Sequence, residues 1–153
     1  MLGTAMPPAA QAQRPIYLRD LECVTVWQGY TNIFTSGADI SIGRELYTSF
    51  MSTGPVGITC RLPGGPGTVE IQYGVPDRSS KPPAIIQVYV DGSEVARQEG
   101  ESGKINTLLV DVSNGQSLAI DINCSRQENC RDHQRYHFFK FHLNPGASSP
   151  GSR

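Results

Sequence analysis

Apolar and polar residues alternate along most of the chain in short runs, which is the pattern of strands with one buried face. No segment repeats apolar residues every 3.6 positions over the length of a helix. About eight or more short strands at regular spacing predict an all-β sandwich or barrel. The strand-like runs are Tyr17–Val26, Glu45–Met51, Gly57–Leu62, Thr68–Tyr73, Ile85–Val90, Ser93–Arg97, Ile105–Val112, Leu118–Ile122 and Tyr136–Leu143.

Turn-forming residues separate these runs. The segment Pro63–Gly67 reads Pro-Gly-Gly-Pro-Gly and is a strong strand breaker. Asp91-Gly92 stands between two strand-like runs, and Asp-Gly in such a place is the strongest hairpin signal in the chain. The turn Asn114-Gly115 predicts a second hairpin, between the runs on either side of it.

Composition fits this fold class and suggests one domain. The chain has 153 residues, of which only 18% are charged, and it is rich in Gly (16) and Pro (11). Residues 1–15 and 144–153 are dominated by Pro, Gly, Ala and Ser, which indicates flexible tails or linkers. The folded part is therefore expected to span residues 16–143, as a module of a larger protein.

The charge pattern argues against two classes of partner. The 13 basic and 14 acidic residues give a net charge of −1, whereas nucleic acids and anionic membranes require a positive field. No apolar run approaches the ~20 residues that span a bilayer, so we expect no direct membrane insertion. The N-terminal segment lacks the basic region and apolar core of a complete signal peptide, although Ala10-Gln11-Ala12 resembles a cleavage site.

The four cysteines are compatible with two disulfides. Cys124 and Cys130 flank a short polar loop that a local bridge closes easily, and Cys23 and Cys60 lie in runs that can become neighbouring strands. Two bridges would indicate an oxidising compartment. One alternative is that Cys23 and Cys60 are buried free thiols. Another is a zinc site, although its cysteines are spaced more widely than is usual; its ligands would be Cys124, Cys130, His133 and His137.

The sequence gives no sign of catalysis. It has no Gly-x-Ser-x-Gly nucleophile elbow, and Pro63–Gly67 lacks the following Lys-Ser/Thr and helix of a phosphate-binding loop. The acidic residues fall in predicted turns or at alternate strand positions, as expected for a solvated surface. An enzyme would need a deep pocket with convergent carboxylates or a nucleophile paired with histidine.

Two clusters have the composition of a sugar-binding site. Sugars present apolar C–H faces and hydroxyl groups, so they need an exposed aromatic ring beside polar partners. Trp27, the only tryptophan, and Tyr30 lie where a strand runs into a polar loop, although Trp27 could instead cap one end of the core. Asp132, His133 and Tyr136 follow the predicted local disulfide, which would hold them rigid; the alternative is a merely solvated loop.

The order of motifs resembles the novel putative carbohydrate-binding modules, the NPCBM family. The likeness covers nearly all of residues 16–143, with two departures. Family members carry Gly and His shortly after the Tyr that matches Tyr47, whereas this chain has Thr48–Met51 at these positions. The tryptophan of the family's closing segment is replaced by Tyr136 in this chain. The matching segments are Tyr17–Leu21, Ile42–Tyr47, Ile58–Gly64, Val69–Val75, Val88–Gly92, Leu109–Ser113, Leu118–Ile120 and Asp132–Tyr136.

The resemblance implies a jelly-roll β-sandwich that is galactose-binding-domain-like. It also implies attachment to secreted or surface proteins and, in some members, a structural calcium. Arg44 lies in one of the matching segments and joins the expected ligand-facing set.

We therefore predict a non-catalytic extracellular or cell-surface module that binds carbohydrate by ring stacking and planar hydrogen bonds. We expect no cofactor other than the structural calcium that some family members carry. The alternative is a protein-interaction or sensor ectodomain of a membrane-anchored protein that kept the fold. A broad exposed apolar patch would favour that alternative over a small polar cleft. The predicted ligand-facing residues are Trp27, Tyr30, Arg44, Asp132, His133 and Tyr136.

Overall fold

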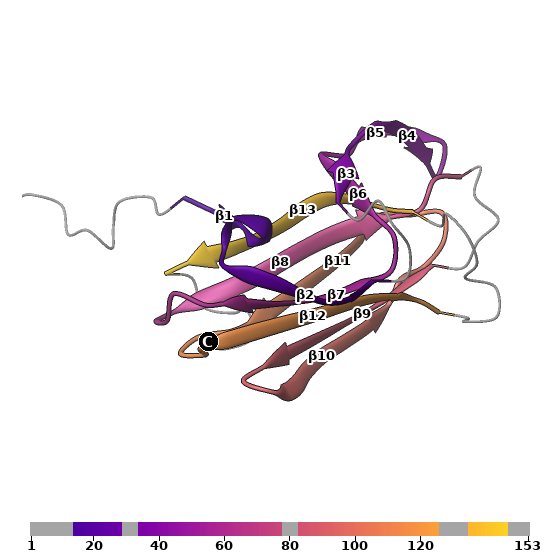
Figure 1. Ribbon diagram of the computed structural model, residues 1–153. Coiled ribbons are helices and arrows are strands. Elements are labelled where there is room, and N and C mark those ends of the chain that lie inside the picture. The colour runs from indigo at the N-terminus through magenta and orange to yellow at the C-terminus, as the bar shows by residue number, and fades with distance from the viewer. Residues whose placement is uncertain (1–13, 29–33, 78–82, 126–134, 147–153) are drawn as a thin grey trace, which may run out of the picture.

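Two antiparallel β-sheets face each other in the computed structural model, which describes residues 14–28, 34–77, 83–125 and 135–146 (Figure 1). The elements are β1 Ile16–Tyr17, the 3₁₀ turn η2 Leu18–Asp20, β2 Cys23–Gln28, β3 Thr35–Ser36, β4 Asp39–Ile42, β5 Glu45–Thr48, β6 Met51–Thr53, β7 Val56–Arg61, β8 Gly67–Gly74, β9 Ala84–Val90, β10 Ser93–Glu99, β11 Asn106–Asp111, β12 Ser117–Cys124 and β13 Tyr136–Pro145. The predicted all-β sandwich is confirmed.

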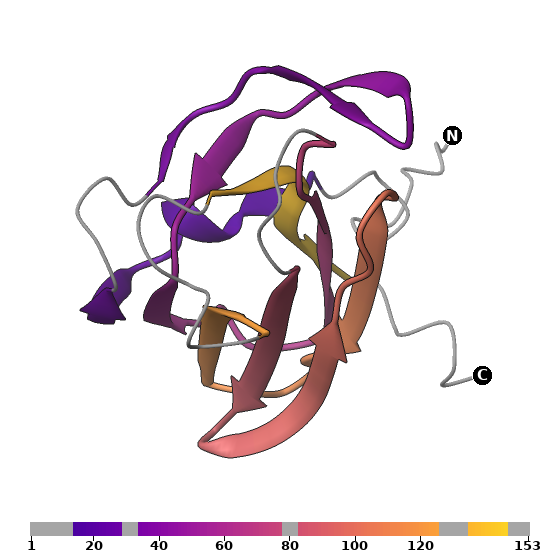
Figure 2. The ribbon, with the colours of Figure 1, turned by 90° about the vertical axis from the view of Figure 1, so that its right-hand side faces the viewer.

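The two layers differ in strand order. The six-stranded sheet has the order β11-β8-β13-β6-β3, with β1 also paired to β13, and the five-stranded sheet has the order β10-β9-β12-β7-β2. The hairpin β4–β5 is separate and lies at the top of Figure 1, on the side of the six-stranded sheet. Figure 2 shows the same hairpin, in purple, arching over one layer and far from β9 and β10.

Alternate side chains of both sheets fill the space between the layers. In β12, Leu118, Ile120 and Ile122 are fully buried, whereas the intervening Ala119 and Asp121 are only half-buried on the outer face. A period of two residues puts every second side chain on the same face of a strand, so the sequence pattern and the core agree here.

The hairpin at Asp91-Gly92 forms as predicted. Both residues have positive φ, 50° and 87°, as a two-residue turn of type I′ requires, and β9 and β10 pair on either side of it. The second predicted hairpin, at Asn114-Gly115, is wrong, because β11 pairs with β8 in one sheet while β12 pairs with β7 and β9 in the other. The residues between β11 and β12 carry the chain across the sandwich.

The first predicted strand is divided in two by a short turn. Leu18, in η2, is fully buried and anchors this turn in the core, while β1 pairs with β13 in one sheet and β2 with β7 in the other. The alternation is in fact interrupted here, since Tyr17-Leu18 and Arg19-Asp20 are like pairs, and the break falls at these residues.

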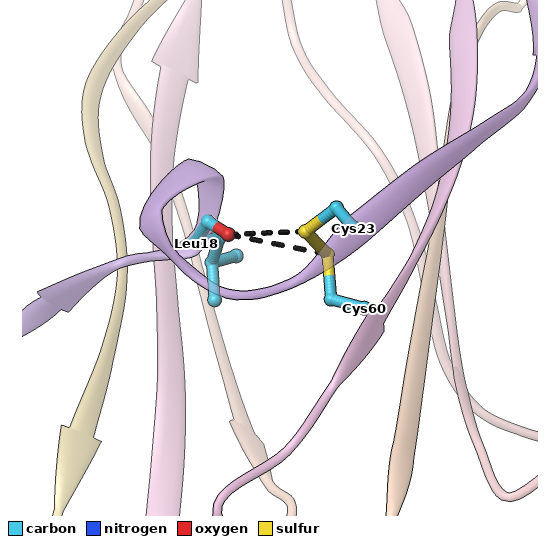
Figure 3. The surroundings of a disulfide bond; sticks show 3 residues. All are labelled: Leu18, Cys23 and Cys60. Carbon is cyan, nitrogen blue, oxygen red and sulfur yellow. Dashed lines mark hydrogen bonds between the residues drawn. A yellow bond between two sulfur atoms is a disulfide. The ribbon is translucent and has the colours of Figure 1, made fainter.

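The predicted bridge between Cys23 and Cys60 is present and links β2 directly to β7, where the two residues are opposite each other (Figure 3). The Leu18 carbonyl oxygen lies 3.3 Å from the Cys23 sulfur and 3.9 Å from the Cys60 sulfur. A disulfide carries no S–H, so these are packing contacts. Cys124 is also disulfide-bonded, which excludes it as a zinc ligand; Cys130, its predicted partner, lies outside the described residues.

Several strands end together at one end of the sandwich, which we call the loop-bearing end. In the five-stranded sheet, Gln28 is opposite Val56, and Cys124 is opposite Ala84. In the six-stranded sheet, His137 is opposite Gly74. The short link Gly54-Pro55 joins β6 to β7 and places these ends of the two sheets together.

Candidate functional site

Trp27 lies outside the core, on the outer face of the five-stranded sheet near the loop-bearing end. It follows a β-bulge in β2 and is half-buried, while its neighbours Val26 and Gln28 are exposed. The indole Nε1–H donates a hydrogen bond to the Asp121 carboxylate, with 3.3 Å between Nε1 and Oδ1. The alternative that Trp27 caps the core is therefore not what the structure shows.

Gly57 lets the indole lie directly against the backbone of β7. The two residues are opposite each other in the β2–β7 pairing, and Gly57 is buried although it is on the outer face. A Cβ atom at Gly57 would stand 2.5 Å from Trp27 Cδ1 and 2.7 Å from Asp121 Oδ1, and it would also overlap Trp27 Nε1. A glycine in a strand interior often marks such a close approach.

Polar side chains continue from the indole across the sheet in a single row. Asp121 is opposite Gly57, Gln87 is opposite Asp121, and Arg97 is opposite Gln87. The Gln87 amide donates to the Tyr89 hydroxyl at 3.2 Å and to the Glu94 carboxylate at 3.1 Å, so its orientation is fixed.

This row, which we call the Trp27 row, combines an aromatic ring with carboxylate, amide and guanidinium groups on adjacent strands. An indole offers an apolar face for C–H groups, and the planar polar groups beside it suit hydroxyl groups. Because strands rather than loops carry these side chains, their spacing is set by the sheet. The arrangement can hold a polar ligand but offers no nucleophile–base pair in the described residues.

Arg44 lies at the tip of the β4–β5 hairpin, on the opposite layer from Trp27 (Figure 1). Gly43 and Arg44 have φ of 62° and 67°, which makes this another two-residue turn. The Asp77 carboxylate accepts hydrogen bonds from the Ser41 hydroxyl at 2.6 Å and from the backbone N–H groups of Gly43 and Arg44 at 2.8 and 2.9 Å. The Ser41 hydroxyl, followed by these two backbone groups, lowers the pKa of Asp77 below its usual value. The structure does not bring Arg44 and Trp27 together.

Tyr136 is fully buried between the sheets, and the surface does not display its ring as expected. The physical reason is a β-bulge in β13 between Phe138 and Lys140, which changes the phase of the alternation. Tyr136 and Phe138 face inward before the bulge, and Phe141 faces inward after it. Burial raises the pKa of the Tyr136 hydroxyl, which has no hydrogen-bond partner among the described residues.

Tyr30, Asp132 and His133 lie outside the described residues. The described residues next to them are Gln28 on one side, and Ser125 and Arg135 on the other, all at the loop-bearing end. That these three side chains face the same ligand as Trp27 stays a prediction.

Sequence reasoning missed residues that hold this region in place. Arg135 donates from Nε to the Ser52 hydroxyl at 3.0 Å, and from Nη2 to the Thr35 hydroxyl at 2.7 Å and the Ser52 carbonyl at 2.8 Å. Burial lowers the pKa of its guanidinium. No sequence signal marks Arg135 as a residue with this role. Gly57 gave no clear signal either, because it is the first residue of its predicted run and not an isolated glycine inside it.

In the ranges that the structure covers, no group of three or more His, Cys, Asp or Glu side chains could hold a metal ion. The described residues therefore contain no cluster of this kind for the calcium that the family resemblance implies. In the same ranges, no helix is long and apolar enough to cross a membrane.

Comparison with solved structures places the architecture among known sugar-binding domains. The CBM51-2 module of Clostridium perfringens ZmpB, in a structure with GlcNAc and INT domains, matches with a TM-score of 0.67 and 15% identity, over 86% of this chain and 31% of that one. The CBM51 of C. perfringens GH95, solved with methyl-galactose, matches with a TM-score of 0.63 and 15% identity, over 85% and 99% of the two chains. This chain has the fold of carbohydrate-binding modules.

The likeness is one of fold. A structure of the M60 catalytic domain with CBM51-1 and CBM51-2, also from ZmpB, matches with a TM-score of 0.66 and 17% identity, over 89% of this chain but only 16% of that one. The chain thus spans less than a third of the length of the ZmpB structures it matches. Neither a protein-family model nor a curated protein matches the sequence. The predicted galactose-binding-domain-like jelly roll is confirmed.

Proposed function

We propose that the chain is a non-catalytic carbohydrate-binding module of the NPCBM type, working within a larger extracellular or cell-surface protein. The observation that carries this proposal is the placement of Trp27. The chain's only tryptophan lies outside the core, against Gly57 and hydrogen-bonded to Asp121, in a fold shared with modules solved in complex with GlcNAc and methyl-galactose.

Binding would combine stacking and hydrogen bonding without bond making. A sugar ring would lie on the exposed part of the Trp27 indole, and its hydroxyl groups would meet Asp121 and Gln87. Asp121 can do so because Trp27 occupies one of the several lone-pair positions of its carboxylate. We propose Tyr30, Asp132 and His133 as further contacts, whereas Arg44, in the β4–β5 hairpin, is not part of this site.

The disulfide supports an extracellular location. A bridge between Cys23 and Cys60 persists in oxidising compartments and is rare in the reducing cytosol. The proposal includes the case in which the module belongs to the ectodomain of a membrane-anchored protein.

One surface bears on the protein-interaction alternative. The rings of Tyr17 and Phe50 are 53% and 39% exposed and lie 5.4 Å apart by the six-stranded sheet. Aromatic side chains bury about 150–250 Å² each, so the exposed parts of this pair amount to roughly 200 Å². A standard protein interface takes about 800 Å² from each partner. The pair is therefore too small to form such an interface alone, and carbohydrate binding remains the better proposal.

A glycan array, run with and without calcium and including glycans that end in GlcNAc and galactose, tests the proposal. Because Trp27 is the only tryptophan, its emission reports directly on binding. We expect Trp27→Ala to weaken binding at least tenfold and Leu109→Ala, an exposed position on the other sheet, to have no effect. An array without signal, together with Trp27 emission that no sugar changes, would refute the proposal and favour protein interaction.

A further inference from the structure

A hollow of about 430 Å³ lies on the same outer face as Trp27, towards the opposite end of the sandwich. Ligand sites in proteins usually have volumes of about 300–1,000 Å³, so its size suits a small polar molecule. Its lining includes Glu22, Arg61, Gln116 and Ser117, together with the bridged Cys23 and Cys60.

Strand register connects the hollow to the Trp27 row. Gly57, Thr59 and Arg61 are alternate residues of β7 and therefore share its outer face. Gly57 is opposite Trp27, while Arg61 is opposite Ser117 at the rim of the hollow. At about 3.3 Å per residue, the four steps from Gly57 to Arg61 cover about 13 Å.

No bulky side chain of the two central strands stands between these positions. Thr59 is opposite Ala119 on β12, and on the far side Ala119 is opposite Tyr89 of β9. A ligand that starts on the Trp27 indole can therefore continue along β7 and β12 without crossing a ridge, with Tyr89 beside it.

The hollow offers hydrogen-bonding groups in fixed positions. Arg61 Nε donates to Glu22 at 2.8 Å, which uses one of the five N–H groups of the guanidinium, and both side chains are well exposed at 76% and 79%. The backbone N–H groups of Gln116 and Ser117 both donate to Asp91 Oδ1 at 3.0 Å, so the segment at the rim is anchored. The Cys23–Cys60 bridge fixes β2 to β7 at the same place.

We propose that this hollow is a second subsite of the Trp27 face, and that the ligand is a neutral oligosaccharide lying lengthwise along β7 and β12. One ring stacks on Trp27, and a ring further along the chain meets Arg61, Ser117 and Gln116. The ligand is neutral because the charged groups in the hollow form an ion pair of opposite sign. This inference rests on the proposed function, and it adds that the length of the oligosaccharide determines its affinity for the module.

The experiment compares two ladders of ligands by calorimetry and Trp27 emission. One runs from GlcNAc to its β-1,4-linked hexamer, and the other from galactose to β-1,4-linked galacto-oligosaccharides. We expect the dissociation constant to fall at least tenfold from the monosaccharide to the longest oligomer of the ladder that binds. Arg61→Ala and Ser117→Arg should weaken oligomer binding about fivefold or more and leave monosaccharide binding unchanged.

The control for Arg61→Ala is Lys104→Ala, which removes another exposed ion pair, that with Glu101, away from this face. Equal affinity for short and long ligands would overturn the inference and leave the proposed function standing, and so would oligomer binding that neither variant in the hollow changes. Failure of every oligomer in both ladders overturns the inference as well. The proposed function is then decided separately by the glycan array.

Discussion

Gly57→Ala tests the Trp27 row without removing any of its functional groups. A methyl group at this position would stand 2.5 Å from Trp27 Cδ1 and 2.7 Å from Asp121 Oδ1. Carbon atoms in contact are normally about 3.5–4.0 Å apart, so the indole must move by about 1 Å or more. That movement breaks its 3.3 Å hydrogen bond to Asp121.

The hydrogen bond sets the scale of the effect. Bonds to charged groups contribute about 1.5–3 kcal/mol, so the original orientation of the indole is disfavoured by at least that amount. If a sugar needs this orientation, the apparent affinity falls about 12- to 150-fold. Stability changes less, because replacing glycine with alanine restricts the unfolded chain and offsets about 0.4–1 kcal/mol.

Titration with the best array ligand measures the affinity, followed by Trp27 emission for Gly57→Ala and by calorimetry for variants without Trp27, and urea denaturation measures the stability. Trp27→Phe is the companion variant, since it keeps an aromatic ring but loses the N–H group, and we expect an intermediate affinity. Wild-type affinity and an unchanged emission spectrum in Gly57→Ala would refute the reasoning. The indole would then not lie against Gly57, or its orientation would not matter for binding.

Three further predictions concern stability. Replacing Cys23 and Cys60 with Ala opens a loop with a sequence separation of 37 residues, so loop-closure entropy predicts a loss of about 4 kcal/mol and a Tm lower by roughly 8–16 °C in a thermal scan; a loss below about 1 kcal/mol would contradict this. Tyr136→Phe removes a buried hydroxyl without a hydrogen-bond partner in the part of the chain that the structure describes, and we expect unchanged or slightly higher stability and unchanged sugar binding, whereas weaker binding would return Tyr136 to the ligand-facing set. The pKa of Asp77 is lowered in the folded state, so its stabilisation of the β4–β5 turn is complete above the ordinary pKa of 3.8 and is lost as the pH falls below that value. NMR of the Gly43 amide during acid titration should show this loss. Asp77→Asn should abolish the transition.

The fold was largely predictable because the sandwich depends on a local pattern. Alternation in runs such as Thr68–Tyr73 places one face of a strand in the core whatever its partner is. The Asp91-Gly92 hairpin was equally local, since positive φ at both residues depends on the turn itself. The hairpin predicted at Asn114-Gly115 was wrong because the partner of each strand depends on distant parts of the chain. β11 pairs with β8 in one sheet, and β12 pairs with β7 and β9 in the other, so the chain crosses between the sheets instead of pairing back.

The site was predictable only in part, because its members come from strands far apart in the sequence. An isolated tryptophan at a strand end indicated a binding platform, but Asp121 meets Trp27 only through the order β12-β7-β2. The Tyr136 prediction failed for a local reason, a single bulge in β13 that exchanges the faces of the residues on either side. Periodicity cannot reveal a bulge when the residues at it are all apolar, as Phe138 and Phe139 are.

The position of Trp27 on an edge strand requires a further explanation, because edge strands have a neighbour on one side only. β2 pairs with β7 alone in its sheet, and its outer residues Val24 and Val26 are 65% and 63% exposed. The disulfide holds one end of β2 against β7, and the contact of the indole with Gly57 holds the other. A ring held in this way loses little freedom when a sugar stacks on it, which favours binding by a neutral ligand that gains nothing from long-range charge attraction. The same two attachments define the ends of the proposed subsite strip, so loosening the disulfide end should weaken long ligands more than short ones.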